Sequence, residues 1–354
     1  MPTAAAAERP NRVPISIVTG FLGSGKTTLL NRLVKQTGMA ATALIINEFG
    51  EVGLDNLLVE TAIENTLVLE NGCICCSVRG DLIDTIGDLF AKAANGEIPD
   101  FDRILIETTG LADPVPIVNT LRNEAAVARR CRMDGVVTVI DGVQGERQAH
   151  SHAEAMAQIA QADIGLISKR DLIDDTAYDG LVDFLHGVNP VLELAPMAEG
   201  WIDPARLFGA DRGLLPAEPE GAAPDGHAHH DHGGHAAHAS HHRHGNVATW
   251  SYAEEAPLDG DRLFAWLRML YSLRSLSVLR MKGLVRLEGE PGPVLIEAVG
   301  PVVSPLRRLP EWPGGRAANR LVLIFKDLAV ASVRASFLRH VVGAACLEND
   351  PMAK

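Results

Sequence analysis

Aromatic residues, cysteines and long apolar segments are all scarce in this sequence. Phe, Trp and Tyr make up only 5% of the 354 residues although hydrophobic residues in total reach 47%, so aliphatic side chains must fill its cores. No apolar run approaches the roughly 18 residues that a transmembrane helix needs, and residues 1–10 lack the apolar centre of a signal peptide. We therefore expect a cytoplasmic protein with no membrane partner.

Basic residues are also too few for a nucleic-acid-binding protein. The chain has 32 Lys and Arg against 45 Asp and Glu, a net charge of -13. Because nucleic-acid binding depends on clustered positive charge, no nucleic-acid partner is expected. The five cysteines do not form the disulfide framework of a small secreted domain, since three of them fall within four residues. They indicate instead a reducing compartment and a thiol site.

The length of the chain predicts two domains, because a single core rarely serves 354 residues. In the first, short apolar runs alternate with helical patterns, which predicts an α/β fold with a mostly parallel sheet. Its strands are expected at 13–19, 42–46, 66–70, 103–106, 135–140, 164–167 and 191–194. The expected organisation is a disordered lead-in at 1–12, the α/β domain at 13–205, a histidine-rich linker at 206–246, a small α+β domain at 247–345 and a tail at 346–354.

The second domain is expected to have strands at 247–252, 278–287, 294–299 and 320–325, with helices at 259–273 and 329–342. It contains no catalytic constellation, so the function is expected to lie in the first domain.

Residues 20–27 match the phosphate-binding pattern G-x-x-x-x-G-K-[ST]. A strand precedes the pattern and a helix over 28–34 follows it, which favours a P-loop NTPase domain over a chance glycine-rich turn. The glycines let backbone N–H groups turn toward a polyphosphate, and the helix N-terminus adds partial positive charge. Lys26 is expected to reach the β and γ phosphates, and the Thr27 hydroxyl to bind Mg²⁺. The predicted contacts here are Gly20, Gly23, Ser24, Gly25, Lys26, Thr27 and Thr28.

A second polar motif, Glu107-Thr108-Thr109-Gly110, follows a buried strand. Ligands of open α/β sheets bind at the carboxyl ends of strands. We expect Glu107 to hold the water shell of Mg²⁺ and the Gly110 N–H to contact the γ-phosphate, although an ordinary strand-to-turn transition is the alternative. With Lys26 and Thr27, Glu107 completes the predicted catalytic set.

The motif Ser168-Lys169-Arg170-Asp171 resembles the base-reading sequence of GTPases, usually Asn-Lys-x-Asp, from which Ser168 departs. The Asp171 carboxylate can accept hydrogen bonds from two adjacent N–H groups of guanine, a pair that adenine does not offer. Lys169 is expected to lay its alkyl stem against the base. The nucleotide predicted for the P-loop is therefore GTP.

Cys73, Cys75 and Cys76 form a Cys-x-Cys-Cys cluster directly after a predicted strand. Thiolates bind Zn²⁺, Co²⁺ and Cu⁺, and three sulfurs in four residues suit an open site from which a metal can leave. Buried free thiols and a redox pair are the alternatives. The spacing favours the metal site.

Together these motifs resemble the CobW-like GTPases, a family of metal chaperones and metal insertases. The matching segments are 20–31, 47–55, 71–76, 107–114 and 168–171, in the family's order, and they span the first domain. The resemblance implies GTP hydrolysis coupled to delivery of zinc or cobalt to a client metalloprotein, with the three cysteines carrying the metal. It also implies a switch segment containing Glu48 and Glu51, either of which can bind Mg²⁺ or the transferred metal.

Nine of the 13 histidines fall within the predicted linker. The tract is rich in Gly, Ala and Asp, so we expect it to be disordered. Neutral imidazoles bind zinc, nickel, cobalt and copper, and an auxiliary role in collecting metal is favoured over a solvated spacer. The residues are His227, His229, His230, His232, His235, His238, His241, His242 and His244.

The sequence thus predicts a GTPase that gates metal transfer, with slow intrinsic turnover because no residue is an obvious base for the attacking water. Two other functions stay open at this point. One is a metal store with a vestigial P-loop, and the other is a small-molecule kinase, which has no need of a Cys-x-Cys-Cys cluster. The oligomeric state does not follow from the sequence.

Overall fold

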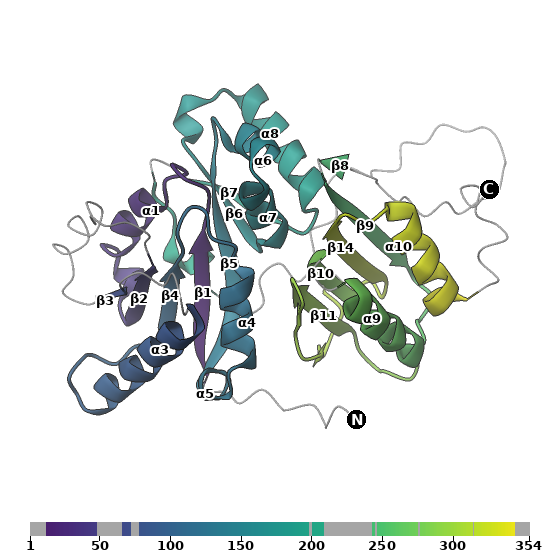
Figure 1. Ribbon diagram of the computed structural model, residues 1–354, viewed down its shortest axis with the longest axis horizontal. Helices are drawn as coiled ribbons and strands as arrows, with labels where there is room; N and C mark the ends of the chain where they lie inside the picture. The colour runs from purple at the N-terminus through teal and green to yellow at the C-terminus, as the bar shows by residue number, and fades with distance from the viewer. Residues whose placement is uncertain are drawn as a thin grey trace.

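The computed structural model describes residues 12–47, 66–71, 78–197, 200–208, 243–244, 246–274, 277–313 and 315–343. These residues form two sheet-based domains side by side, the first built from residues 12–208 and the second from 243–343 (Figure 1). The first domain carries every described residue of the predicted nucleotide site.

A parallel seven-stranded sheet forms the centre of the first domain, with strand order β3-β2-β4-β1-β5-β6-β7. This confirms the predicted α/β class. β5 begins four residues earlier than expected and β7 two residues later. The strands are β1 (Val13–Thr19), β2 (Thr42–Asn47), β3 (Thr66–Asn71), β4 (Arg103–Glu107), β5 (Cys131–Asp141), β6 (Ile164–Ser168) and β7 (Glu193–Pro196).

Helices cover both faces of this sheet, which is why its strands are apolar on both sides. In β5, Val137 and Val139 pack on the side of α1, whereas Val136 and Ile140 pack on the opposite side, beneath the remaining helices. The helices are α1 (Lys26–Leu33), α3 (Val78–Ala94), α4 (Val115–Asn123), α5 (Ala125–Ala128), α6 (Gly145–Ser151), α7 (Ala153–Gln161) and α8 (Asp175–Val188). Leu207 is buried in the same core as α1, so this core continues past the boundary predicted at 205.

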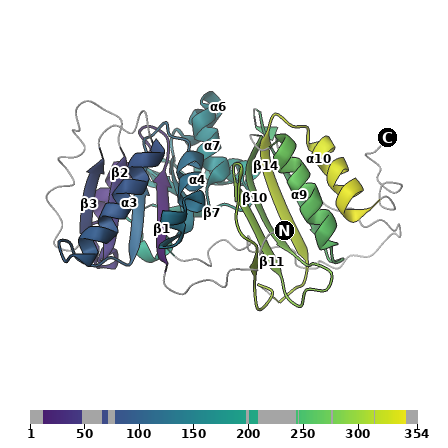
Figure 2. The same ribbon diagram turned by 60° about the horizontal axis from the view of Figure 1, so that its bottom comes forward.

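The second domain is an antiparallel sheet with order β12-β11-β10-β14-β9-β8, and β13 pairs with β11. Figure 2 shows α9 and α10 on the face of this sheet that is turned away from the first domain. The sequence predicts its four long strands and both helices, but not the short β8, β12 and β13. The elements are β8 (Arg243–His244), β9 (Val247–Glu254), α9 (Gly260–Arg274), β10 (Val278–Val285), β11 (Val294–Val299), β12 (Val302–Val303), β13 (Arg307–Arg308), β14 (Asn319–Lys326) and α10 (Val330–Phe337), which a π-helical turn (Leu338–Val342) extends.

The two domains share a hydrophobic cluster. Leu279 of β10 and Ile324 of β14 pack with Ile159 of α7 and Leu185 of α8. The Thr249 hydroxyl also donates to the carbonyl oxygen of Val188 at 2.9 Å. Because buried contacts of this kind cross the boundary, the second domain is docked on α7 and α8 rather than tethered by the linker alone.

Part of the predicted linker is ordered. Arg243–His244 forms β8 and pairs with β9, because the edge of β9 offers free ladder positions there. The expectation of disorder is therefore wrong for these two residues, and the remaining histidines of the tract lie outside the described residues. Among the described helices, none has the length and apolar character to cross a membrane.

Candidate functional site

The P-loop connects β1 to α1 in a backbone path that only glycine accommodates. Gly20 and Gly25 have φ of 145° and 98°, in the left-handed half of conformational space. A Cβ atom on Gly20 would lie 2.3 Å from the carbonyl oxygen of Val139 in the neighbouring strand. The backbone path of the loop therefore requires glycine at positions 20 and 25.

Helix α1 begins at Lys26, two residues earlier than predicted, because the loop closes directly into the first helical turn. Its N-cap is Gly25, and no side chain caps the helix within the described residues. The first N–H groups of α1 are therefore available to an anion at the loop. The Lys26 ammonium lies over the same loop, where Nζ donates to the carbonyl oxygens of Gly20 at 2.7 Å and Phe21 at 3.3 Å.

The motif after β4 lies beside the P-loop. Glu107 pairs in register with Val18 at the ends of β4 and β1, which brings the two loops together. The Thr108 hydroxyl donates to Thr19 Oγ1 at 2.9 Å, and Gly110 packs on Leu22 so closely that a Cβ atom would lie 2.6 Å from Leu22 Cδ2.

The base-reading motif follows β6 and is bonded to the P-loop by its first residue. Ser168 Oγ lies 2.6 Å from the carbonyl oxygen of Ser24 and 3.1 Å from that of Ile140. Ser168 therefore bonds the backbone of the P-loop through its hydroxyl. Asp171 lies in a short helix (Arg170–Leu172) with its side chain exposed.

Asp141, at the end of β5, is a site residue to which the sequence analysis assigns no role. Its Oδ2 lies 2.5 Å from Lys169 Nζ, and its Oδ1 accepts from the N–H groups of Val143 and Gln144. The Asp141 side chain is 2% exposed, so this ion pair fixes the direction of the half-exposed Lys169 side chain. An acidic residue directly after an apolar strand is the signal that could have found it.

The segment after β7 reaches the same edge. Gly200 packs on α1, where a Cβ atom would lie 2.9 Å from Thr28 Cγ2, and the adjacent Trp201 side chain is 52% exposed. The dipeptide Gly200-Trp201 after a strand is the sequence feature that could have predicted this segment as part of the site. Because β6 and β7 are neighbours, this segment borders the base-reading motif.

The predicted metal ligands Glu48, Glu51, Cys73, Cys75 and Cys76 lie outside the described residues. Their segments follow β2 and β3, whose last residues, Asn47 and Asn71, are paired in register. Both segments therefore begin at the carboxyl ends of the strands, the end of the sheet at which the P-loop also lies. Within the described part of the chain, no group of three or more His, Cys, Asp or Glu is placed to hold a metal.

The described donors fit Mg²⁺ bound together with a nucleotide. Mg²⁺ in such sites takes one or two protein oxygens, and phosphates and waters complete the shell. Thr27, in the first turn of α1, offers one hydroxyl, and Glu107, at the end of β4, offers one carboxylate. When bound, the ion would neutralise charge on the β and γ phosphates.

A P-loop, a strand-terminal acidic motif and a base-reading motif at one edge of a parallel sheet define the class of P-loop GTPases. Residues 14–195 match the family described as CobW/HypB/UreG, nucleotide-binding domain, and residues 247–341 match the cobalamin synthesis protein cobW C-terminal domain. The chain belongs to this family.

Curated relatives extend over almost the whole chain. It is 29% identical to the zinc chaperone YjiA of Escherichia coli, with 92% of this chain and 98% of that protein covered. It is 31% identical to the zinc chaperone CobW of Pseudomonas aeruginosa, with 91% and 90% covered. The crystal structure of Zn(II)-bound YjiA GTPase from E. coli has the same fold, with a TM-score of 0.70 at 24% identity over 93% of this chain and 99% of that one.

Proposed function

We propose that this GTPase is a metal chaperone, which binds zinc or cobalt at Cys73, Cys75 and Cys76 and delivers it to a client metalloprotein under the control of GTP hydrolysis. The observation that carries the proposal is a shared position at the carboxyl ends of neighbouring parallel strands. The P-loop follows β1, Glu107 ends β4, and the segment that contains the cysteines follows β3. The names of the relatives, zinc chaperones, support it. The domain boundaries and the cytoplasmic location stay predictions.

Each residue of the site has a role that its position supports. The N–H groups of the P-loop and of α1 hold the phosphates, and Lys26 moves its ammonium from the Gly20 carbonyl to the β and γ oxygens. Asp171 reads the guanine edge while Lys169, oriented by Asp141, lies along the base. Gly110 donates its N–H to the γ-phosphate.

Hydrolysis removes the γ-phosphate, so the conformation of the residues that contact it depends on whether GTP or GDP is bound. We expect Glu48 and Glu51 to respond to the γ-phosphate, and the loss of this phosphate on hydrolysis to change how Cys73, Cys75 and Cys76 hold the metal. Loss of geometry at an open thiolate site favours release of the metal to the client.

Lys26→Ala is expected to lower the rate of GTP hydrolysis by about 10²–10³-fold, because one preorganised cation is removed from the developing phosphate charge. Phosphate release under saturating GTP measures it. Lys35→Ala is the matched control, since Lys35 is an exposed lysine just beyond the end of α1, and its rate should equal that of the wild type. Equal rates for all three proteins would favour a metal store with a vestigial P-loop.

GTP is expected to change the Kd of the wild type for Zn²⁺ or Co²⁺ by at least about fivefold, the lower end of typical couplings between sites. Metal titration with and without a GTP analogue measures the change. Cys75→Ser should lose this metal site. Cys131→Ala is the control and should keep it, since burial raises the pKa of the Cys131 thiol to about 12 and leaves it protonated. A metal affinity that GTP leaves unchanged in the wild type contradicts the gating.

A further inference from the structure

Helix α7 contacts the P-loop at its first turn. The ring of His152, its N-cap residue, stacks on the ring of Phe21 with centroids 4.6 Å apart and planes 26° apart. The helix then runs antiparallel to β5 across the sheet and ends next to the second domain (Figure 1). One rigid element of nine residues, about 14 Å long, thus joins the nucleotide edge to the domain boundary.

In the middle of α7, Gln158 holds the loop that follows Glu107. Its Nε2 lies 3.0 Å from the carbonyl oxygen of Ala112 and 3.3 Å from that of Gly110. The Gln158 side chain is buried at 1% exposure, so these bonds compete little with water. The residue expected to contact the γ-phosphate through its N–H is therefore held by α7 through its carbonyl.

At the C-terminal end of α7, the second domain supplies a cation. Arg280 of β10 donates to the carbonyl oxygen of Gln161 at 2.9 Å, while Asn189 donates to the carbonyl oxygens of Ile159 and Ala162 at 3.0 and 2.9 Å. These carbonyls lie at the C-terminal end of the helix, where intrahelical donors run out, and a positive charge at this end favours the helix dipole. Helix α7 is thus hydrogen-bonded directly to β10.

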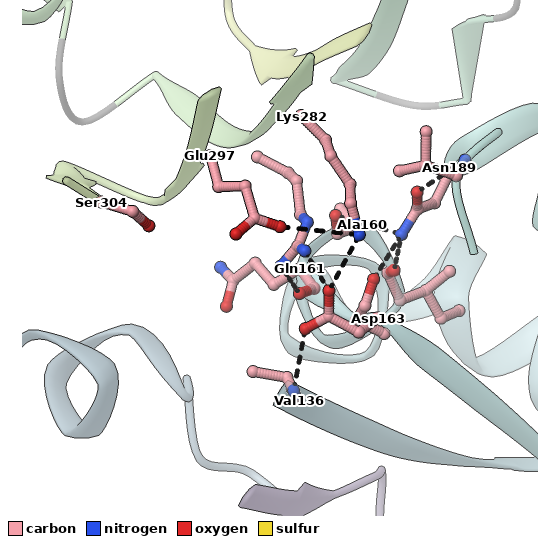
Figure 3. A network of polar contacts seen from close by, with 12 residues as sticks. Val136, Ala160, Gln161, Asp163, Asn189, Lys282, Glu297 and Ser304 are labelled. Atoms are coloured by element: carbon pink, nitrogen blue, oxygen red, sulfur yellow. Dashed lines mark hydrogen bonds and ion pairs between the residues drawn. The ribbon is translucent and has the colours of Figure 1, made fainter. Parts of the chain in front are cut away.

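The Asp163 network reinforces this joint (Figure 3). The network consists of Asp163, Arg280, Lys282, Glu297 and the Val136 N–H. Arg280 pairs with Asp163, Lys282 lies 3.6 Å from both Asp163 and Glu297, and the Val136 N–H donates to Asp163 at 2.9 Å. Both cationic side chains are almost completely buried, at 3% and 2% exposure. Small shifts of α7 must therefore move β10 or break buried ion pairs.

We propose that α7 transmits the nucleotide state of the loop at Gly110 to the second domain, through Gln158 in the middle of the helix and the Gln161–Arg280 bond at its C-terminal end. The proposal rests on the proposed function, in which Gly110 contacts the γ-phosphate. The second domain is then the part of the molecule whose presentation to a client protein changes with hydrolysis.

A second arrangement of the loop is within reach of Gln158. Its Oε1 is buried without a hydrogen-bond partner among the described residues. A buried acceptor without a hydrogen bond destabilises the fold, so a loop position that turns an N–H toward Oε1 recovers that free energy. In the proposed transition Nε2 bonds the loop carbonyls in the position observed, and Oε1 is the acceptor for a loop N–H in the other nucleotide state.

Amide hydrogen exchange of the full chain, with GDP and with a GTP analogue that is not hydrolysed, tests the proposal. In the wild type, exchange across β10 should differ between the two nucleotides by at least about fivefold. In Gln158→Met, which keeps the side-chain length and removes the amide, the difference should fall below about twofold. Gln148→Met is the matched control and should keep it, because Gln148 lies on α6 and donates to the Leu22 carbonyl, not to the carbonyls of Gly110 and Ala112.

Protection of residues 20–28 in the same data reports nucleotide binding separately. Protection there with no difference across β10 in the wild type overturns the transmission and leaves the proposed function standing, whereas no protection there overturns both. If Gln158→Met does not fold, Arg280→Lys decides, since lysine keeps the charge but lacks the guanidinium fork whose two Nη atoms bond Gln161 and Asp163 separately. A nucleotide-dependent difference that survives in Arg280→Lys also overturns the proposal.

Discussion

Asp171→Asn is expected to weaken GTP binding by about 10²–10⁴-fold. Each hydrogen bond from guanine to a charged carboxylate contributes roughly 1.5–3 kcal/mol, a donor left unsatisfied costs about 1–3 kcal/mol more, and about 1.4 kcal/mol corresponds to a factor of ten. Asparagine keeps one acceptor but turns an N–H₂ toward the second guanine donor, so that bond becomes a donor–donor contact.

Xanthosine triphosphate provides the positive half of this test. Xanthine has a carbonyl where guanine has its amino group, so the asparagine N–H₂ gains a partner and the preference for guanine should reverse. Competition binding with GTP and XTP measures the ratio. Asp175→Asn is the control and should leave the ratio unchanged, because Asp175 is exposed and pairs with Arg170. An unchanged ratio in Asp171→Asn would show that the base is read elsewhere.

Asp163→Ala is expected to lower the free energy of unfolding by about 3–5 kcal/mol, because it leaves the buried Arg280 without its carboxylate. Urea unfolding, followed by circular dichroism and by the fluorescence of the buried Trp250 and Trp266, measures the loss. Glu255→Ala is the control. Glu255 bonds Arg316 at 2.8 Å with both side chains 65% exposed, and such pairs contribute less than about 1 kcal/mol. Equal losses for the two variants would mean that the Asp163 network does not hold the domains.

The same carboxylate predicts a pH dependence. Burial by itself raises the pKa of Asp163, but Arg280, Lys282 and the Val136 N–H outweigh it and hold the pKa below the ordinary value of 3.8. The unfolded chain therefore takes up a proton at a higher pH than the folded chain does. The stabilisation is present above pH 3.8 and is lost as the pH falls through the folded pKa. The difference in unfolding free energy between the wild type and Asp163→Asn should accordingly narrow below this pH.

The nucleotide site could be predicted because its parts are short and local. Gly20 and Gly25 are required by backbone conformation, and Lys26 and Thr27 follow them directly in the chain. Glu107 and Ser168 could be found because each stands at the end of an apolar strand. Asp141 obeys the same rule and was missed, since a single acidic residue without a motif around it resembles any strand end. The predicted roles of these residues, and of the cysteines and histidines outside the described residues, stay predictions.

The sequence by itself determined the P-loop, the alternation of strands and helices, and the thiol cluster, because each is written in neighbouring residues or in a period of the chain. It also predicts the base, through Asp171. Only the tertiary structure decided what joins these parts. Gln158, Gln161 and Asp163 are unremarkable polar residues in the sequence, and Arg280 lies more than a hundred positions away. The bonds of Gln161 and Asp163 to Arg280 form only where β10 of the second domain meets the end of α7. Through this docking, helix α7 connects the nucleotide site of the first domain with β10 of the second domain.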